Sequence, residues 1–344
     1  MTPHSVNYSP SVNDVLSMVH TMALIREFEE VAAQSLFAGE VRGSVHQYSG
    51  QEAIATGVCF HLNKSDFVSS NHRGHGHAIA KGVSPDKMMC ELFGKLGGTS
   101  HGKGGSMHIA DFSCGMLGAN GVVPDGVTIA VGAAHAIKMQ KRSEIVVAFF
   151  GDGALNRGPL FEAFNWAVLF KLPILFVCED NSYSVTLKTQ TVTGGPDPIE
   201  RVQAFGIPCF QTNGNDVVQV STCAKELIEK VRSGAGPQFM RAKTYRWYGH
   251  LAHDKGLYRD PIEVAKAQKD DCIKHASNWL ESNGVASNII SETQQKAALV
   301  IAQSVLVARQ SPLPSAGSAY EDVQDLVEQT ASDFKHDLKL QVVE

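Results

Sequence analysis

The sequence lacks the features that mark membrane-spanning, exported or nucleic-acid-binding proteins. No apolar run reaches the roughly 18 residues of a transmembrane helix. The opening stretch MTPHSVNYSPSVNDV has neither a basic start before an apolar run nor an arginine-rich amphipathic helix. No long basic run is present to neutralise a phosphate backbone, and 30 Lys and Arg stand against 35 Asp and Glu. We expect no membrane span, no export signal and no nucleic-acid partner.

The cysteines lack the pattern of a disulfide framework. The seven cysteines are odd in number and never form a C-x-x-C pair. They are Cys59, Cys90, Cys114, Cys178, Cys209, Cys223 and Cys272. This favours reduced thiols and a cytoplasmic location. The 344 residues are 43% hydrophobic, which is ample for a packed globular core.

Apolar periodicity predicts an α/β protein. Residues 145–178 indicate a strand at 145–150, a helix that opens with Pro159 and a second strand at 172–178. This order is typical of a βαβ unit with parallel strands. The same patterns predict strands at 207–213 and 237–245 and a helix at about 216–232.

The sequence predicts helices at both ends of the chain. We expect a single domain over residues 1–344, with an N-terminal helix at about 12–40 and a mainly helical extension at about 261–344. Between them, residues 43–135 are dense in Gly and His, which predicts loops that approach a ligand closely.

Oxygen ligands follow both strands of the predicted βαβ unit. Asp152 stands in Gly-Asp-Gly after the first strand, and Glu179-Asp180-Asn181 follows the second. In a parallel sheet, ligands bind beyond the carboxyl ends of the strands. Carboxylate and amide oxygens suit Mg²⁺ completed by phosphate oxygens and water. Gly-Asp-Gly alone equally fits an ordinary turn, but the second group of ligands favours a magnesium-diphosphate site.

The spacing from Gly151-Asp152-Gly153 to Asn181 resembles the thiamine diphosphate signature. The chain is similar, from about residue 15 to 262, to the alpha subunits of the first component of 2-oxo-acid dehydrogenase complexes and of acetoin dehydrogenase. The motifs that carry the likeness are IREFEE, GSVHQYSGQEA, HRGHGHAIAKG, GKGGSMHIAD, MLGANG, GDGALNRG, FEAFNWAVLFKLPILFVCEDNSY and TYRWYGH. Within this family, three motifs resemble acetoin dehydrogenase more than pyruvate dehydrogenase: HRGHGHAIAKG, MLGANG and YRWYGH. Pyruvate enzymes are expected to carry Tyr-Arg in place of His72-Arg73. The resemblance implies a thiamine-diphosphate-binding α/β fold, with a mainly parallel sheet flanked by helices.

The resemblance also implies roles for individual residues. Asp152 and Asn181 would bind Mg²⁺ through side chains, and Tyr183 through its main-chain carbonyl. The other residues implied to bind the cofactor are His72 and His250, the arginine clamps Arg73 and Arg246, the diphosphate-binding amides of Gly153 and Ala154, and the aminopyrimidine contacts Gly121 and Val123.

The histidines admit more than one interpretation. The resemblance implies that His46 faces the substrate. It also implies that His250 belongs to a mobile loop over the active site, where it would polarise a carbonyl or orient the acceptor in acyl transfer. An ordinary hydrogen-bonded surface histidine remains the alternative for His46. His72, His75 and His77 invite a metal hypothesis, but their spacing in a Gly-rich loop does not aim three imidazoles at one point.

The chain departs from the family pattern in places. Pro124 and Asp125 stand where glycine-like residues are expected, and Asp125 would add a charge near the pocket. The stretch LAHDKGLYRD at 251–260 contains no Ser or Thr to accept the phosphorylation that controls some relatives; instead, we expect it to become ordered when the cofactor binds. Nothing assigns Glu52 or Glu162 as the glutamate that activates the cofactor.

We therefore expect the alpha subunit of an α2β2 heterotetramer whose beta subunit supplies the activating glutamate. It would cleave acetoin or a 2-oxo acid, with thiamine diphosphate and magnesium, and pass the activated acyl unit to a lipoyl acyltransferase. One alternative is a carboligase or split transketolase-like enzyme that transfers the activated aldehyde to another carbonyl, and another is a non-catalytic subunit.

Overall fold

A computed structural model describes residues 8–195 and 197–321. Its main sheet has six parallel strands in the order β2-β1-β3-β4-β8-β7. These strands are β1 (Phe67–Ser69), β2 (Met116–Gly118), β3 (Val146–Gly151), β4 (Ile174–Asp180), β7 (Cys209–Asn213) and β8 (Gln238–Lys243). A separate antiparallel pair consists of β5 (Tyr183–Ser184) and β6 (Leu187–Lys188). The predicted α/β fold with a mainly parallel sheet is confirmed.

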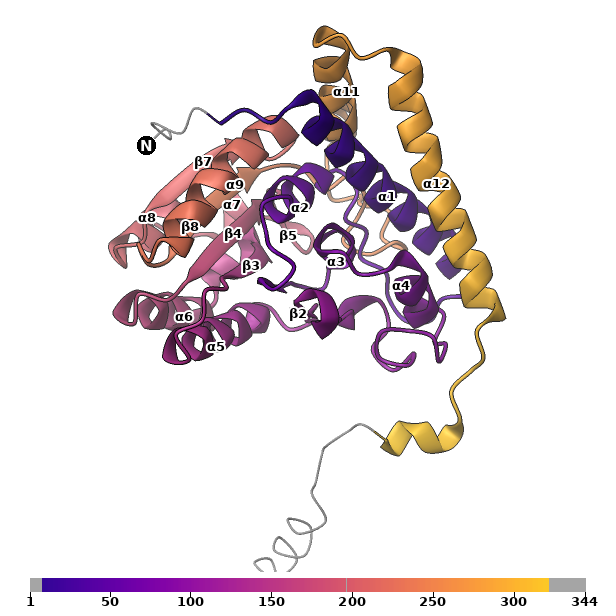
Figure 1. Ribbon diagram of the computed structural model, residues 1–344, viewed down its shortest axis with the longest axis horizontal. Helices are drawn as coiled ribbons and strands as arrows, with labels where there is room; N and C mark the ends of the chain where they lie inside the picture. The colour runs from indigo at the N-terminus through magenta and orange to yellow at the C-terminus, as the bar shows by residue number, and fades with distance from the viewer. Residues whose placement is uncertain (1–7, 196, 322–344) are drawn as a thin grey trace, which may run out of the picture.

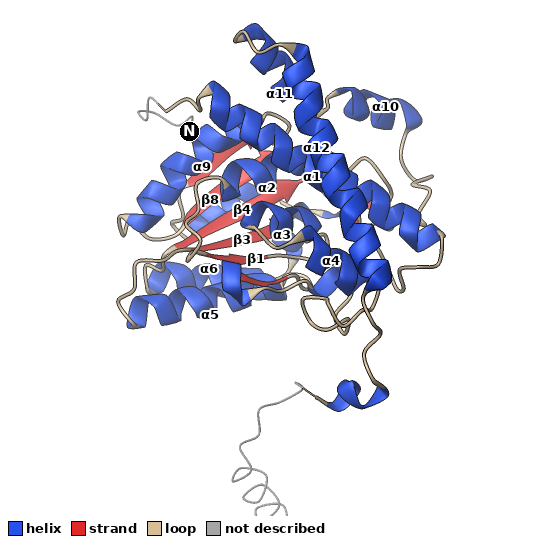
Figure 2. Ribbon diagram, turned by 45° about the vertical axis from the view of Figure 1, so that its right-hand side comes forward, coloured by secondary structure: helices blue, strands red, loops and turns tan. Residues whose placement is uncertain are grey.

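Helices cover both faces of the sheet (Figures 1 and 2). The larger described helices are α1 (Val12–Phe37), α2 (Glu52–Cys59), α3 (His75–Lys81), α4 (Pro85–Leu92), α5 (Asp125–Met139), α6 (Gly158–Leu169), α8 (Pro198–Ala204), α9 (Val217–Arg232), α10 (Pro261–Lys269), α11 (Cys272–Ser282) and α12 (Ser287–Gln310). Helices α5, α6 and α8 share one apolar core with the sheet, whereas α1, α2, α3, α4, α9 and α12 share the other. The sheet is therefore the buried middle layer, as a parallel sheet requires.

The central strands are buried because their residues are apolar on both faces. Residues 146–150 of β3 and all of β4 are buried. Parallel pairing places Val146 opposite Ile174 and Gly151 opposite Glu179, so the two strands end at the same edge. The predicted βαβ unit is confirmed, and its carboxyl edge is where ligands of such sheets bind.

Helix α1 lies against α12, the long helix drawn in orange in Figure 1. A capping box fixes its start: the Ser11 side chain accepts from the Asp14 amide, and the Asp14 side chain accepts from the Ser11 amide. The buried face of α1 includes Ile25 and Phe28, which join the large core on that side of the sheet. This places the IREFEE segment beside the loops that form the functional site.

Some elements differ from the sequence expectation. The Gly- and His-rich region contains the short strands β1 and β2, several helices and most of α5, rather than loops alone. Strand β4 continues through Glu179 and Asp180, so only Asn181 follows it. All seven cysteines are free and buried. Within residues 8–195 and 197–321, no helix is long and apolar enough to cross a membrane.

Candidate functional site

A cavity of about 550 Å³ opens at the carboxyl edge of β3 and β4. Every site residue predicted from the sequence lines it: His46, His72, Arg73, Gly121, Val123, Asp152, Gly153, Ala154, Asn181, Tyr183, Arg246 and His250. These residues come from loops far apart in the chain, and the parallel sheet brings them to one place. The structure thus assembles the predicted residues, while their roles stay predictions.

Asp152 is a buried carboxylate that lines this cavity. It begins a short 3₁₀ turn directly after β3, and it is only 3% exposed. Its Oδ2 accepts a hydrogen bond from the Thr189 hydroxyl, but its buried Oδ1 has no partner. Burial and the nearby Asp180 raise the pKa of Asp152 to about 7. An unpartnered buried carboxylate oxygen is costly, and a cation would relieve that cost.

Asn181 is held close by, with its amide side chain fixed at both ends. Its Nδ2 donates to Gln51 Oε1 at 3.1 Å, and its Oδ1 accepts from the Tyr183 amide at 3.1 Å. The adjacent carboxylates have other partners. Glu179 accepts from Tyr48 and His77, and Asp180 forms an ion pair with Arg241. Asp152 and Asn181 are therefore the strand-end oxygens best placed to meet a ligand.

The backbone around Gly153 leaves no room for a side chain. A Cβ at this position would lie 2.6 Å from Ser184 Oγ and 2.9 Å from Ser184 Cβ. Gly153 and Ala154 both belong to the turn that follows β3 and both line the cavity. Close approach of the β5 strand to this turn therefore requires glycine.

Two of the arginines that line the cavity are buried. Arg73 and Arg246 are 4% and 1% exposed, and neither forms an ion pair with a carboxylate of the described chain. Arg73 donates to the carbonyls of Gln47 and His250, and Arg246 donates to those of Val185 and Tyr248. Burial, together with Arg246, lowers the pKa of Arg73 to about 9. Paired buried guanidiniums without an acidic partner suit a strongly charged anion such as a diphosphate.

Three histidine rings gather at the same cavity. The ring centroids of His46 and His72 lie 4.7 Å apart, those of His46 and His250 4.9 Å, and those of His72 and His250 5.4 Å. Burial and the neighbouring arginine charges lower their pKa values to about 3 for His46, about 2 for His72 and about 4 for His250. All three imidazoles are therefore neutral near pH 7.

The remaining histidines of HRGHGH have structural partners. His75 contacts Glu29 at 3.0 Å and Ser106 at 2.9 Å through its two ring nitrogens. His77 in the same way contacts Ser70 and Glu179. Because both rings use both nitrogens away from His72, the structure does not join these three histidines at one metal.

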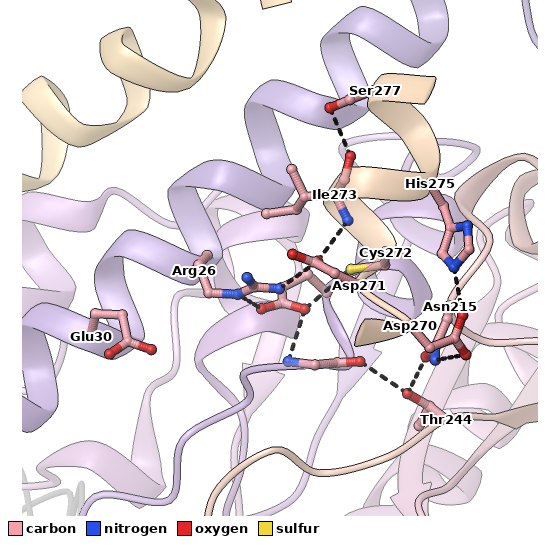
Figure 3. A network of polar contacts seen from close by, with 12 residues as sticks. Arg26, Glu30, Asn215, Thr244, Asp270, Asp271, Cys272, Ile273, His275 and Ser277 are labelled. Atoms are coloured by element: carbon pink, nitrogen blue, oxygen red, sulfur yellow. Dashed lines mark hydrogen bonds and ion pairs between the residues drawn. The ribbon is translucent and has the colours of Figure 1, made fainter. Parts of the chain in front are cut away.

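A polar network holds the segment that carries Arg246. The Arg26 guanidinium lies over the Trp247 ring at 3.9 Å and also contacts Glu52. It forms an ion pair with Asp271 as well (Figure 3). Glu52 in turn accepts from the Gly50 amide. The network therefore ties α1 to the start of α11 and braces the residue next to Arg246.

The loop at 251–260 is hydrogen-bonded to the segment that carries Arg246 and His250. Asp254 accepts from the His250 amide at 2.7 Å and from the Tyr258 hydroxyl at 2.8 Å. Arg246 donates to the Tyr258 hydroxyl, while Arg259 donates to the Arg246 carbonyl at 2.6 Å. The loop and Arg246 thus position each other. His253, in the same loop, packs its ring against Phe37.

The departure at Pro124 and Asp125 lies beside the cavity rather than in it. Gly121 and Val123 line the cavity, whereas Asp125 stands in the first turn of α5 and is not among the described lining residues. A carboxylate in a first helical turn complements the helix dipole. The expectation that Asp125 charges the pocket is therefore not supported by its position.

Sequence reasoning missed two residues that support the predicted ligands. Thr189 bonds to Asp152, and Gln51 bonds to Asn181, across 37 and 130 positions of the chain. Gln51 lies within the motif GSVHQYSGQEA, so the motif indicated that this segment belongs to the site but did not predict the bond to Asn181. No local pattern indicated Thr189.

Comparison with known proteins places the chain in a family. The family model described as "Dehydrogenase E1 component" matches residues 20–316. This chain is 40% identical to the acetoin:2,6-dichlorophenolindophenol oxidoreductase alpha subunit of Bacillus subtilis, over 90% of this chain and 92% of that protein. It is 39% identical to the subunit of the same name from Cupriavidus necator, over 90% of this chain and 93% of that protein. The pyruvate dehydrogenase E1 component alpha subunit of Rhizobium meliloti is 36% identical over 91% of this chain and 90% of its own length. The chain belongs to the dehydrogenase E1 component family, whose members depend on thiamine diphosphate.

Proposed function

We propose that this chain is the alpha subunit of a cytoplasmic enzyme that cleaves acetoin or a 2-oxo acid and passes the activated acyl unit to a lipoyl acyltransferase. The observation that carries the proposal is the cavity itself. In it, an unpartnered carboxylate oxygen of Asp152 lies at the same site as two arginines without acidic partners. Acetoin is the favoured substrate, because the relatives at 40% and 39% identity carry acetoin in their names.

The described residues fit a magnesium-diphosphate group. The unpartnered Oδ1 of Asp152 offers a hard anionic ligand, and Asn181 Oδ1 and the Tyr183 carbonyl would complete the protein's share. The Gly153 turn would let backbone amides meet the diphosphate, and Arg73 and Arg246 would balance its remaining charge. Gly121 and Val123 would contact the aminopyrimidine through their backbones, and His72 and His250 would contact the cofactor from the loops.

Bound thiamine diphosphate would supply the electron sink for breaking the bond beside the carbonyl. His46 and His250 would act as catalytic residues that hold or move a proton at the substrate oxygen. Because their lowered pKa values keep both rings neutral, each can hydrogen-bond to the substrate oxygen without carrying a charge.

Among the described residues, no carboxylate at the cavity is free to activate the cofactor. Asp152 and Glu179 are the carboxylates among its described lining residues, and Glu179 is already bonded to Tyr48 and His77. Glu52 is held by Arg26, while Glu162 is exposed on α6. A beta subunit, the partner that the homologous alpha subunits imply, would supply the activating glutamate in an α2β2 heterotetramer.

The test is to purify the chain together with a beta subunit and to follow consumption of acetoin, pyruvate and branched-chain 2-oxo acids. We expect consumption that requires thiamine diphosphate and Mg²⁺, is fastest with acetoin, and reduces lipoamide when the acyltransferase is added. Consumption independent of the cofactor would refute the proposal. A carboligase product without reduced lipoamide would favour the carboligase alternative, which no described contact favours.

A further inference from the structure

The three histidines at the cavity come from separate loops that meet. His46 lies in the loop between α1 and α2, His72 in the loop between β1 and α3, and His250 in the loop after β8. One ligand-capable nitrogen from each lies within 4.8 Å of the other two. His46 is 94% buried, and its Nδ1 has no hydrogen-bond partner. A buried unpartnered ring nitrogen beside two more imidazoles calls for a ligand.

We propose that His46, His72 and His250 form a binding site for a late first-row transition-metal ion such as Zn²⁺, distinct from the oxygen site at Asp152. Three histidines with an open fourth position are an established donor set for Zn²⁺. The binding claim rests on the ring geometry and does not depend on the cofactor.

The two donor sets in this cavity have opposite preferences. Asp152 and Asn181 offer hard oxygen atoms, which suit Mg²⁺, whereas imidazole nitrogen suits Zn²⁺, Co²⁺, Ni²⁺ and Cu²⁺. Mg²⁺ should therefore not displace a metal from the histidines. The same contrast gives the experiment its control, because each site can be removed without touching the other.

The histidines need only a small inward movement to bind one ion. Zn–N bonds of about 2.0–2.1 Å at tetrahedral angles place ligand nitrogens about 3.3 Å apart. The present nitrogens lie within 4.8 Å of one another, so the loops would close by about 1–1.5 Å. The side chains of His72 and His250 are only partly buried, which leaves room for that adjustment.

The charged neighbours determine what the fourth ligand must be. Arg73 and Arg246 face the rings and oppose a bare dication, and Arg246 Nη1 contacts His250 Nδ1 at 3.4 Å. Asp254 beside His250 offsets part of this charge. An anionic fourth ligand, such as chloride or inorganic phosphate, would pair with the arginines and complete the site. Phosphate should therefore strengthen metal binding.

A metal at this position would inhibit the enzyme. This consequence, unlike the binding, rests on the proposed function, because the ion would tie up His46 and His250 where the carbonyl substrate is expected. Inhibition by Zn²⁺ should then persist in saturating Mg²⁺, and a chelator should reverse it.

The binding test uses Co²⁺ as a spectroscopic probe on the full chain, without thiamine diphosphate and with excess Mg²⁺. We expect one Co²⁺ per chain, with visible absorption bands typical of nitrogen ligation. His72→Gln and, separately, His250→Gln should each weaken binding more than about 10-fold, since even the loss of an outer-shell partner costs 10–100-fold. Asp152→Asn and the exposed control His275→Gln should leave the spectrum unchanged.

The outcomes separate the proposal from its rivals. Binding that survives both histidine substitutions, or that is lost in Asp152→Asn, would overturn it. If circular dichroism shows that one histidine variant does not fold, Co²⁺ binding by the other variant tests the proposal. Arg246→Met supplies an independent check, because removing an opposing charge should tighten Co²⁺ binding. Loss of thiamine diphosphate binding with intact Co²⁺ binding would count against the proposed function alone.

Discussion

Replacing Asp152 with Asn should have opposite effects on the apoprotein and on cofactor binding. The substitution keeps the shape of the side chain and its contact with Thr189, but it removes the buried charge. Without a cation, that charge is destabilising, since Oδ1 has no partner and burial raises the pKa of the carboxyl. With Mg²⁺ and thiamine diphosphate, the same charge should be the strongest protein ligand.

The size and sign of the effect follow from linkage. One pKa unit corresponds to about 1.4 kcal/mol, so a rise from 3.8 to about 7 sets an upper limit of about 4 kcal/mol. Because the folded pKa lies above the unfolded one, the native apoprotein loses this stability as pH rises from about 4 to about 7. The Asp152→Asn variant has no carboxyl to ionise, so its stability should not fall in this way as pH rises. The variant should therefore match the wild type near pH 4 and be the more stable of the two above pH 7.

The assay pairs thermal unfolding of the metal-free chain with calorimetric titration of the assembled enzyme. We expect a higher Tm for Asp152→Asn at pH 8 and a cofactor affinity at least about 100-fold weaker, or about 2.7 kcal/mol. Unchanged affinity for thiamine diphosphate in the presence of Mg²⁺ would refute the metal assignment. A lower Tm at pH 8 would refute the view that this charge is unsatisfied in the apoprotein.

Further predictions concern the turn, the loop and the partner. Gly153→Ala should clash with Ser184, destabilise the chain by about 1–3 kcal/mol and weaken cofactor binding. Gly158→Ala is the control, because a Cβ there meets no atom within 4 Å, and it should have neither effect. Unfolding measures the stability of both variants, and calorimetry measures their cofactor affinity. Limited proteolysis at 251–260 should slow when cofactor and Mg²⁺ are added, and equal rates would remove the idea that the cofactor orders this loop. The isolated chain should show little turnover until the beta subunit is added, and robust turnover alone would place the activating glutamate within this sequence.

The centre of the fold was predictable because its signals are local. Residues 145–150 and 172–178 are apolar runs that bracket a helix, and strand ends in a parallel βαβ unit meet at one edge. That rule alone brings Asp152 and Asn181 together. The family motifs then add the arginines and histidines, which the structure places around the same cavity.

Other features depend on contacts that no local pattern encodes. Strands β1 and β2 have only three residues each, too few for an alternation to show. Helix α5 begins at Asp125 inside a Gly-rich region that favoured loops. The bond from Thr189 to Asp152 and the meeting of His46, His72 and His250 join distant segments, so they follow from tertiary packing.

The most direct test of the account is an anomalous-difference map of the assembled enzyme crystallised with thiamine diphosphate and Mn²⁺ in place of Mg²⁺. We predict a peak within bonding distance of Asp152 Oδ1, Asn181 Oδ1 and the Tyr183 carbonyl, with the diphosphate between that ion and the two arginines. A peak elsewhere, or a diphosphate that contacts neither Arg73 nor Arg246, would contradict the assignment of this cavity as the cofactor site.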